Sequence, residues 1–149
     1  MNTTIYLCGG IAGLSDAQCN DWRTQVKKEL PQVAYSTNHA DIFFGLDFLD
    51  PMRRDYRGVV IDDALAHRLC KEDKKDIQSS DIILAMCPVP SWGTAMEIMY
   101  AYDKLDKWVV VVCNSPKVSP WLMEHSDYLV GTLEEAYAAI TTIMEGMVG

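Results

Sequence analysis

The chain has 149 residues, which is enough for one domain with a sizeable hydrophobic core. Apolar residues make up 49% and charged residues 23% of the sequence, and this ordinary globular composition excludes a disordered or fibrous protein. A formal net charge of −8 disfavours a nucleic-acid-binding protein, because neutralising phosphates needs a basic face. We therefore expect one domain over residues 1–149 that acts on small molecules and binds no nucleic acid.

The five cysteines are scattered through the chain, with no CxxC pair and no histidine at metal-ligand spacing. They are Cys8, Cys19, Cys70, Cys87 and Cys113. This pattern is typical of reduced thiols in a reducing compartment and indicates no metal site. The first ten residues carry no basic segment followed by an apolar stretch, and no apolar run reaches the length of a membrane span. We expect a cytoplasmic protein with no secretory signal and no membrane contact.

The first predicted unit is a strand, a glycine loop and a helix. Residues 4–8 are β-prone and stop at the glycine pair 9–10. The sequence SDAQ at residues 15–18 resembles a capping box, and an apolar face recurs at helical spacing over residues 19–30. Residues 32–36 are predicted to form a second, weaker strand.

Residues 37–58 mix aromatic, acidic and basic side chains without a sustained period. We interpret this segment as a long functional loop, because it is too apolar to be disordered. Its charge-dense part, residues 50–58, is either a solvated turn with surface ion pairs or part of a lid that packs against a flat ligand. The aromatic and apolar side chains that favour the lid are Phe43, Phe44, Phe48, Leu49 and Tyr56.

The second half of the chain alternates helical and strand patterns. Residues 82–87 and 108–113 are uninterrupted apolar runs, typical of strands covered on both faces. An edge strand is predicted at residues 128–130, and helices are predicted at residues 59–77, 94–105, 119–123 and 132–147. The alternation predicts an α/β fold with a doubly wound parallel sheet of five strands in a flavodoxin-like order, flanked by helices. In that order, the loops after the first and the central strand face one ligand crevice.

No standard nucleotide-binding motif is present. Gly9, Gly10 and Gly13 do not form the GxGxxG pattern, and no GxxxxGK[ST] sequence occurs. The glycine loop is therefore either a tight strand-to-helix turn or a ligand contact, and its place at the predicted crevice favours contact.

Glu97 is predicted in the first turn of the helix that follows the loop at residues 90–93. Acidic residues are favoured there by the helix dipole, so a surface carboxylate is one interpretation. A catalytic carboxylate is favoured by Asp73, Asp55 and Tyr6, whose segments can end at the same crevice. An ionised carboxylate beside a second one that holds a proton is what glycosidic displacement through a covalent intermediate requires.

The chain resembles the nucleoside 2-deoxyribosyltransferases and the related 2'-deoxynucleoside 5'-monophosphate N-hydrolases over nearly its full length. The motifs that carry the resemblance are IYLCGG at residues 5–10, DxxxIxxSD at residues 73–81 and SxGTxxExxxA at residues 91–101, followed by Lys107 and a valine-rich strand. The resemblance implies a flavodoxin-like fold, a retaining double displacement and no cofactor.

By this resemblance Glu97 is the nucleophile on the anomeric carbon, Asp73 passes a proton to the departing base, and Tyr6 positions the nucleophile. Asp55 falls where the transferases place a base-reading side chain, and an aspartate there indicates a preference for adenine or cytosine. The other substrate contacts implied are Gly9, Gly10, Arg57, Ser91, Gly93 and Ser119.

Ser91 distinguishes the two branches of the family. Many transferases carry an aspartate six residues before the nucleophile, whereas the monophosphate hydrolases carry a serine that helps hold the 5'-phosphate. Serine does not repel a phosphate dianion, so nucleotides can enter. Gly10 replaces a phosphate-binding serine of the hydrolases, and backbone N–H groups of the turn at residues 9–13 can substitute for it. Family members also complete each site from a neighbouring subunit, so we expect residues 119–121 to contact a second subunit in a homodimer or larger homo-oligomer.

The expected function is cleavage of the N-glycosidic bond of 2'-deoxynucleosides or their 5'-monophosphates through a covalent Glu97 intermediate, with transfer of the sugar to a free nucleobase. An N-glycosidase that transfers the sugar to water is the alternative within the family, since both reactions share the first step. A non-catalytic nucleotide-binding sensor is the alternative of another class, and the combination of Tyr6, Asp73 and Glu97 counts against it. A flavodoxin-like electron carrier is disfavoured, because residues 8–13 contain no hydroxyl side chain.

Overall fold

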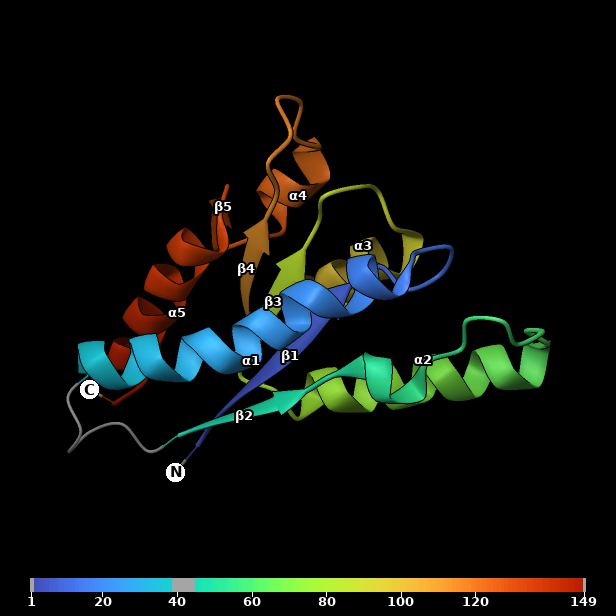
Figure 1. The fold of residues 1–149 in the computed structure, drawn as a ribbon, viewed down its shortest axis with the longest axis horizontal. Coiled ribbons are helices and arrows are strands. Elements are labelled where there is room, and N and C mark those ends of the chain that lie inside the picture. The colour runs from blue at the N-terminus through green and yellow to red at the C-terminus, as the bar shows by residue number, and fades with distance from the viewer. Residues whose placement is uncertain (1, 39–44, 149) are drawn as a thin grey trace.

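Five parallel strands form the central sheet, in the order β2-β1-β3-β4-β5 (Figure 1). The computed structural model describes residues 2–38 and 45–148. The strands are β1 (Thr3–Gly9), β2 (Leu46–Leu49), β3 (Ile82–Met86), β4 (Trp108–Val112) and β5 (Tyr128–Val130). Every strand pairing is parallel. The α/β class and the flavodoxin-like strand order predicted from the sequence are confirmed.

Helices cover both faces of the sheet (Figure 1). Helices α1 (Asp16–Asn38) and α5 (Leu133–Val148) lie on one face, and α2 (Asp63–Gln78) and α3 (Trp92–Met99) lie on the other. The remaining short elements are the 3-10 helix η1 (Pro51–Arg54), the π-helical turn η2 (Tyr100–Lys104) and helix α4 (Pro120–Glu124). Among the described helices, none combines the length and the apolar character that a transmembrane span needs.

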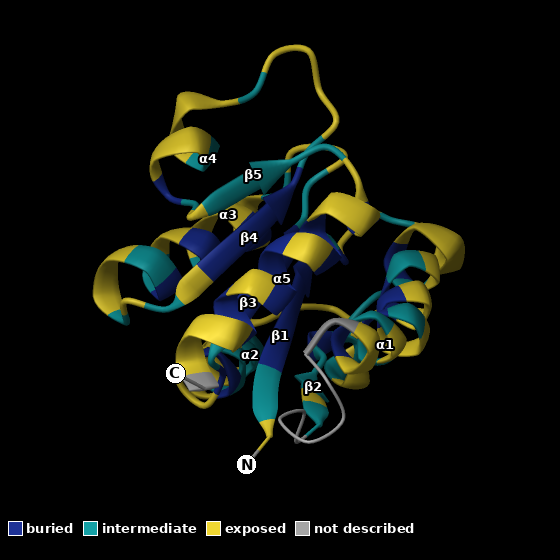
Figure 2. Ribbon diagram, turned by 90° about the vertical axis from the view of Figure 1, so that its left-hand side faces the viewer, coloured by how far each residue is buried: buried dark blue, intermediate teal, exposed yellow. Residues whose placement is uncertain are grey.

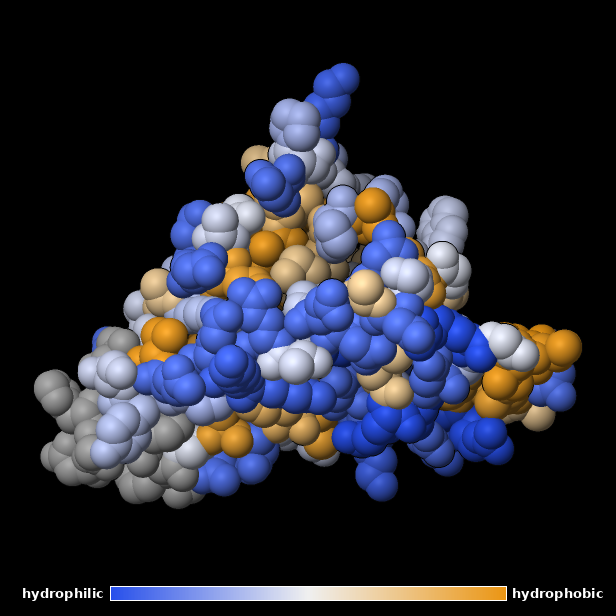
Figure 3. All heavy atoms as spheres, viewed as in Figure 1, coloured by the Kyte–Doolittle hydropathy of each residue, from blue (hydrophilic) through white to orange (hydrophobic). Residues whose placement is uncertain are grey.

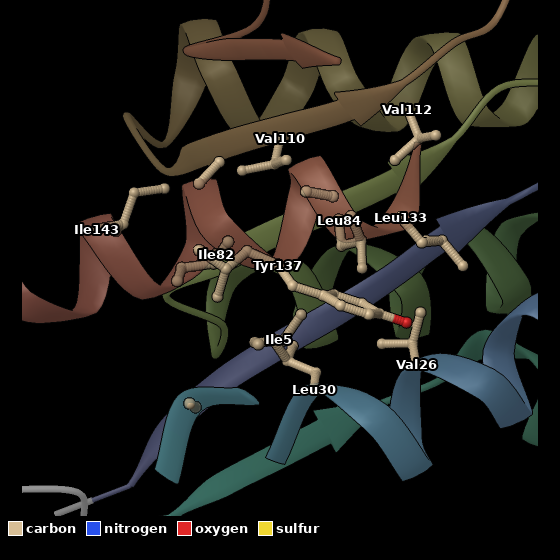
Figure 4. Packing of buried hydrophobic residues seen from close by; sticks show 14 of the residues in the cluster. Ile5, Val26, Leu30, Ile82, Leu84, Val110, Val112, Leu133, Tyr137 and Ile143 are labelled. Atoms are coloured by element: carbon tan, nitrogen blue, oxygen red, sulfur yellow. The ribbon is translucent and has the colours of Figure 1, made fainter. Parts of the chain in front are cut away.

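Strands β1, β3 and β4 are buried on both faces (Figure 2), as the apolar runs of β3 and β4 predicted. Figure 4 shows one of the two cores, where Ile5 and Leu84 of the sheet lie beside Leu30 of α1. Because side chains alternate along a strand, Tyr6 and Ile83 point to the opposite face and pack in the second core, with α2 and α3. Tyr6 therefore lies on the face of the sheet that carries the predicted site helices.

Two helix starts are set by side-chain caps. The capping box before α1 is confirmed: Ser15 N donates to Gln18 Oε1 at 2.9 Å, and Gln18 N donates to Ser15 Oγ at 3.2 Å. Helix α2 begins only after Asp62, whose Oδ1 accepts from Leu65 N at 2.8 Å. Residues 59–61, predicted as the start of this helix, form instead an exposed apolar segment, visible at the right-hand edge of Figure 3.

The strand predicted at residues 32–36 is wrong, because α1 continues through Pro31 to Asn38. Ala34 is fully buried and extends the apolar face of Leu30 by one turn. Packing of this face on the sheet therefore outweighs the hydrogen bond that a proline removes from a helix interior.

The second strand, β2, lies in the segment interpreted as a long loop. Phe48 of β2 packs in the core under α1 and α5, while Leu49 packs toward α2 and α3. Both side chains belong to the sheet, so the lid interpretation is wrong for them. Phe43 and Phe44, which were assigned to the same lid, lie outside the described residues.

The second half of the chain follows the predictions closely. Strand β5 occupies the predicted residues 128–130, and the long helix predicted at residues 132–147 is α5. The helix predicted at residues 94–105 starts two residues earlier and is divided, because α3 ends at Met99 and η2 continues it with wider turns.

Candidate active site

A cavity of about 550 Å³ opens beyond the carboxyl ends of β1 and β3, where the ligand crevice was predicted. Its walls come from the loop after β1, from Pro51 and Tyr56, from α2, and from the loop and helix that follow β3. The predicted site residues that line it are Gly9, Gly10, Asp73, Ser91, Gly93 and Glu97. The fold thus brings distant segments to one place, and the roles of these residues remain predictions.

The hydroxyl of Tyr6 donates a hydrogen bond to Oε2 of Glu97. Glu97 was predicted in the first turn of its helix, but α3 begins at Trp92, so Glu97 lies in the second turn. The helix dipole acts mainly within the first turn. The close stabilising partner of the Glu97 carboxylate is therefore the phenol, which reaches it from the neighbouring sheet.

Burial raises the pKa of Glu97 to about 7, and the charge of Asp73 adds to this effect. The hydrogen bond from Tyr6 and the charges of Arg23 and Arg54 favour the ionised form and limit the rise. Burial, together with the charge of Glu97, raises the pKa of Tyr6 far above its usual value, so the phenol stays a proton donor. Glu97 consequently changes its charge near neutral pH, a property that is common in catalytic carboxylates.

Asp73 reaches the same cavity from α2, with its side chain 25% exposed. Arg54 Nη2 lies 2.6 Å from Asp73 Oδ1. Burial raises the pKa of Asp73, and the hydrogen bond and charge of Arg54 act against this rise. The cavity therefore holds two interacting carboxyl groups, which lose their protons as a coupled pair.

The turns that approach the cavity are closely packed. Ser91 is the N-cap of α3, and its hydroxyl accepts a backbone hydrogen bond at 3.4 Å. A Cβ atom on Gly10 would lie 2.9 Å from Leu14 and 3.7 Å from Ser91. A Cβ atom on Gly9 would lie 2.6 Å from the ring of Trp22. The glycine pair thus has a packing function and also keeps the cavity wall free of side chains.

A second cavity of about 450 Å³ lies beside the first, and residues 89–92 line both. Ser119 lines this second cavity, where its Oγ caps α4 by accepting from Trp121 N at 3.2 Å. Within one chain, Ser119 does not line the cavity that contains Glu97.

The described residues contain no cluster of three or more His, Cys, Asp or Glu side chains placed to hold a metal ion. The five cysteines are free thiols. Burial raises the pKa of the Cys8 thiol well above its usual value, which makes it a poor nucleophile.

Solved structures with the same architecture are known, although no protein-family model and no curated sequence matches this chain. A 2-deoxyribosyltransferase from Bacillus psychrosaccharolyticus aligns with a TM-score of 0.61 at 16% identity, covering 91% of this chain and 90% of that chain. A 2-deoxyribosyltransferase from Leishmania mexicana gives a TM-score of 0.58 at 16% identity, with coverages of 94% and 97%. The chain has the 2-deoxyribosyltransferase fold.

The same fold is found in a CMP N-glycosidase from Clostridium botulinum, with a TM-score of 0.52 at 13% identity and coverages of 95% and 99%. The matched solved structures thus include two proteins named as transferases and one named as a glycosidase. The resemblance inferred from the sequence is confirmed at the level of the 2-deoxyribosyltransferase fold.

Besides Ser119, two predicted substrate contacts, Asp55 and Arg57, lie outside the cavity that contains Glu97. Asp55 is exposed and forms an ion pair with Arg57, with Nη2 2.8 Å from Oδ2, and this pairing lowers the pKa of Asp55 to about 2. Arg57 also lies 2.8 Å from Asp16 and donates to the carbonyl of Leu14 at 3.2 Å. Of this turn, Tyr56 lines the cavity. A role for Asp55 or Arg57 in reading a base therefore requires their ion pair to open.

The sequence reasoning missed two arginines at the candidate site. Arg23 is 1% exposed, and its Nη2 donates to the carbonyl of Gly9 at 3.2 Å. The signal for it was an arginine on the apolar face of the helix predicted over residues 19–30. Arg54, which holds Asp73, belonged to a charge-dense turn for which surface ion pairs are the usual expectation, and no pattern singled it out.

Proposed function

We propose that this chain cleaves the N-glycosidic bond of 2'-deoxynucleosides or their 5'-monophosphates and passes the deoxyribosyl group to another nucleobase. The observation that carries the proposal is the hydrogen bond from Tyr6 to Glu97 at a cavity that also contains Asp73. This combination supplies a positioned nucleophile and a second carboxyl group able to hold a proton, which are the two requirements of a retaining displacement. The names of the matched transferases and of the CMP N-glycosidase support the same class of reaction.

In the first half-reaction, an ionised Oε atom of Glu97 attacks C1' while the bond from C1' to the base nitrogen breaks. Asp73 gives its proton to the departing base, so the base leaves neutral. Tyr6 donates a hydrogen bond to Glu97 and orients it. In the second half-reaction the same phenolic O–H stabilises the Glu97 carboxylate as it leaves the ester. The products of this step are a free base, a glycosyl ester on Glu97 and an ionised Asp73.

In the second half-reaction, the nitrogen of an incoming base attacks C1' of the ester and gives a proton to Asp73. Glu97 leaves as the carboxylate, and the enzyme returns to its starting state. The cavity of about 550 Å³ lies within the range of small-molecule sites.

Hydrolysis is a second candidate, and Ser91 is the observation that favours it. Ser91 lines the cavity and caps α3, so it presents a hydroxyl where a carboxylate would repel a phosphate. With a 5'-monophosphate bound, water in place of a base would resolve the ester. The fold match to a CMP N-glycosidase supports this candidate.

Product analysis separates these candidates. The purified protein is incubated with each deoxynucleoside and its 5'-monophosphate, with and without a competing base, and the products are resolved by chromatography. A new nucleoside identifies transfer, and free sugar or sugar phosphate identifies hydrolysis. Saturable binding without any release of base would instead identify a non-catalytic sensor. Cleavage at the wild-type rate by Glu97→Gln would exclude Glu97 as the nucleophile.

We further propose that the protein acts as a homo-oligomer in the cytoplasm, with Ser119 completing the site of a neighbouring subunit. Trp121, which follows Ser119 in α4, has 68% of its surface exposed, and Met123 has 62%. These apolar side chains support a contact between subunits. The free thiols support a reducing compartment. Light scattering tests the oligomeric state. Mixing the inactive variants Glu97→Gln and Ser119→Tyr tests whether sites are shared. If they are, a mixed oligomer contains sites with both Glu97 and Ser119 intact, and activity is recovered.

A further inference from the structure

The carboxyl group of Asp73 is held on one side only. Its Oδ1 lies 2.6 Å from Nη2 of Arg54. Within the part of the chain that the structure describes, Oδ2 of Asp73 has no hydrogen-bond partner. One oxygen is therefore fixed while the other is left for a ligand in the cavity.

Arg54 is itself anchored by a more deeply buried carboxylate. The same Nη2 atom lies 2.7 Å from Oδ2 of Asp76, whose side chain is 11% exposed. Arg53 also binds Asp76, with its Nη2 2.8 Å from Oδ1 and 2.7 Å from Oδ2. Asp76 thus ties both arginines of η1 to α2, but only Arg54 extends from this anchor to Asp73.

We infer that Arg54 is a positioning residue for proton transfer, which fixes Asp73 through Oδ1 so that Oδ2 exchanges the proton with the nucleobase. This inference rests on the proposed function of Asp73. A carboxyl group held at both oxygens could not donate, and one held at neither would rotate away from the base. Fixing one oxygen keeps the acid in reach without blocking it, and such orientation is worth about 10- to 100-fold in rate.

Arg54 also adjusts the charge of the site. The groups that interact with Asp73 are Arg54 from η1, Glu72 and Asp76 from α2, Glu97 from α3, Tyr6 and Cys8 from β1, and Tyr56 from the turn after η1. Of these, Arg54 is the cation, and it also favours the ionised form of Glu97. Removing it takes a cation away from both carboxyl groups and leaves Arg23 as the remaining cation that favours ionised Glu97, so both groups hold their protons to higher pH.

Arg54→Gln tests the inference, with Arg53→Gln as its matched control. Both substitutions remove an arginine that binds Asp76, but only the first removes the contact with Asp73. We expect Arg54→Gln to lower kcat by about 10- to 100-fold with KM changed less than about threefold. Its profile of activity against pH shifts to higher pH, while Arg53→Gln keeps a kcat within about threefold of the wild type and an unshifted profile.

The chemistry of the leaving group gives a second readout. In 7-methyl-2'-deoxyguanosine or its 5'-monophosphate the base is already cationic and departs without receiving a proton. At a pH where Glu97 is ionised in both proteins, Arg54→Gln should therefore cleave this substrate at nearly the wild-type rate, because the remaining defect is in the step that depends on Asp73. A general disruption of the site would lower the cleavage rates of the methylated and the unmodified substrate equally, and that result would overturn the inference.

Two further measurements keep the test decisive. If Arg54→Gln does not fold, Arg54→Lys replaces it, since lysine keeps the charge but cannot bridge two carboxylates as a planar guanidinium does. Lower kcat with an unshifted pH profile is then expected, and wild-type kcat overturns the inference. Carbon-13 NMR titration of Asp73 gives a result that does not depend on turnover: its pKa rises in Arg54→Gln. If the Glu97→Gln variant is inactive and the separate Arg54→Gln variant is fully active, the role of Arg54 is rejected while the proposed function stands. If the Glu97→Gln variant still cleaves the substrate, the proposed function is rejected.

Discussion

The Tyr6 hydroxyl and the Glu97 carboxylate are joined by a hydrogen bond, although 91 positions separate the two residues in the chain. Tyr6→Phe keeps the buried ring and removes only the donor. We expect kcat to fall about 10- to 100-fold with little change in KM, because the nucleophile loses the group that orients it. The pKa of Glu97 should rise as well, since this hydrogen bond favours the ionised form.

Steady-state kinetics and a pH profile of Tyr6→Phe check this expectation. Tyr128→Phe is the control, because Tyr128 lies on the edge strand β5 and lines neither cavity. Equal kinetics of Tyr6→Phe and the wild type would show that the phenol has no part in the reaction.

The two carboxyl groups predict a bell-shaped dependence of kcat/KM on pH. The pair is active with one proton, because Glu97 must attack as the anion while Asp73 must hold a proton. Activity therefore falls at low pH, when a second proton binds, and falls again at higher pH, when the last proton leaves the pair; burial raises the pKa of both groups, which moves this active range above that of free carboxyl groups.

In Asp73→Asn, activity should no longer fall on the alkaline side of this pH profile. Only the ionisation of Glu97 then remains, so activity, lowered about 10²- to 10⁴-fold by loss of the acid, should rise to a plateau with increasing pH. Rates at a series of pH values for the two proteins measure the effect. A bell-shaped profile in Asp73→Asn would assign the shared proton to another group.

Glu97→Gln should stabilise the folded protein above neutral pH. The folded-state pKa of Glu97 is about 7, above the ordinary value of 4.5, so the folded protein holds a proton that the unfolded chain releases. Stability therefore decreases as pH rises from about 4.5 through 7. Glutamine does not ionise and avoids this loss, which is at most about 3 kcal/mol.

Urea unfolding at pH 8 and at pH 4.5 measures this difference. The substitution should raise the midpoint at pH 8 and have little effect at pH 4.5, where Glu97 is protonated in the folded state. A midpoint difference that is the same at both pH values would mean that the effect of glutamine is not electrostatic.

Ser91→Asp tests whether this position admits a phosphate. Aspartate is also a good N-cap, so α3 should keep its start. The new carboxylate would repel a 5'-phosphate and lower kcat/KM for deoxynucleotides about 10- to 100-fold, while deoxynucleosides react as before. Ser91→Asn provides an uncharged cap of similar size. If nucleotides and nucleosides respond alike to Ser91→Asp, the 5'-group does not bind near this residue.

Much of the fold was predictable because its signals are local. The uninterrupted apolar runs of β3 and β4 and the capping box at Ser15 each specify an element within a few residues of sequence. The predictions of secondary structure were wrong where tertiary packing determines whether a segment forms a helix or a strand. Ala34 continues a helix past Pro31 because a sheet lies beneath it, and β2 is only four residues long and depends on pairing with β1.

The site was predictable only in part, for the same reason. Motif spacing singled out Tyr6, Asp73 and Glu97, and strand order brings their segments together. The link from Arg54 to Asp73 joins η1 to α2, and nothing in a charge-dense turn reveals which carboxylate an arginine will bind. Asp55 illustrates the converse, because its neighbour Arg57 holds it at the surface.

Tyr6 belongs to the hydrophobic core through its ring and to the site through its hydroxyl. Its position consequently has little freedom to diverge: phenylalanine would keep the fold and weaken the chemistry, while a small polar residue would damage both. The exposed turn around Asp55 is under no such double constraint. Substitutions at that turn therefore carry less risk to the packing of the core than substitutions at Tyr6.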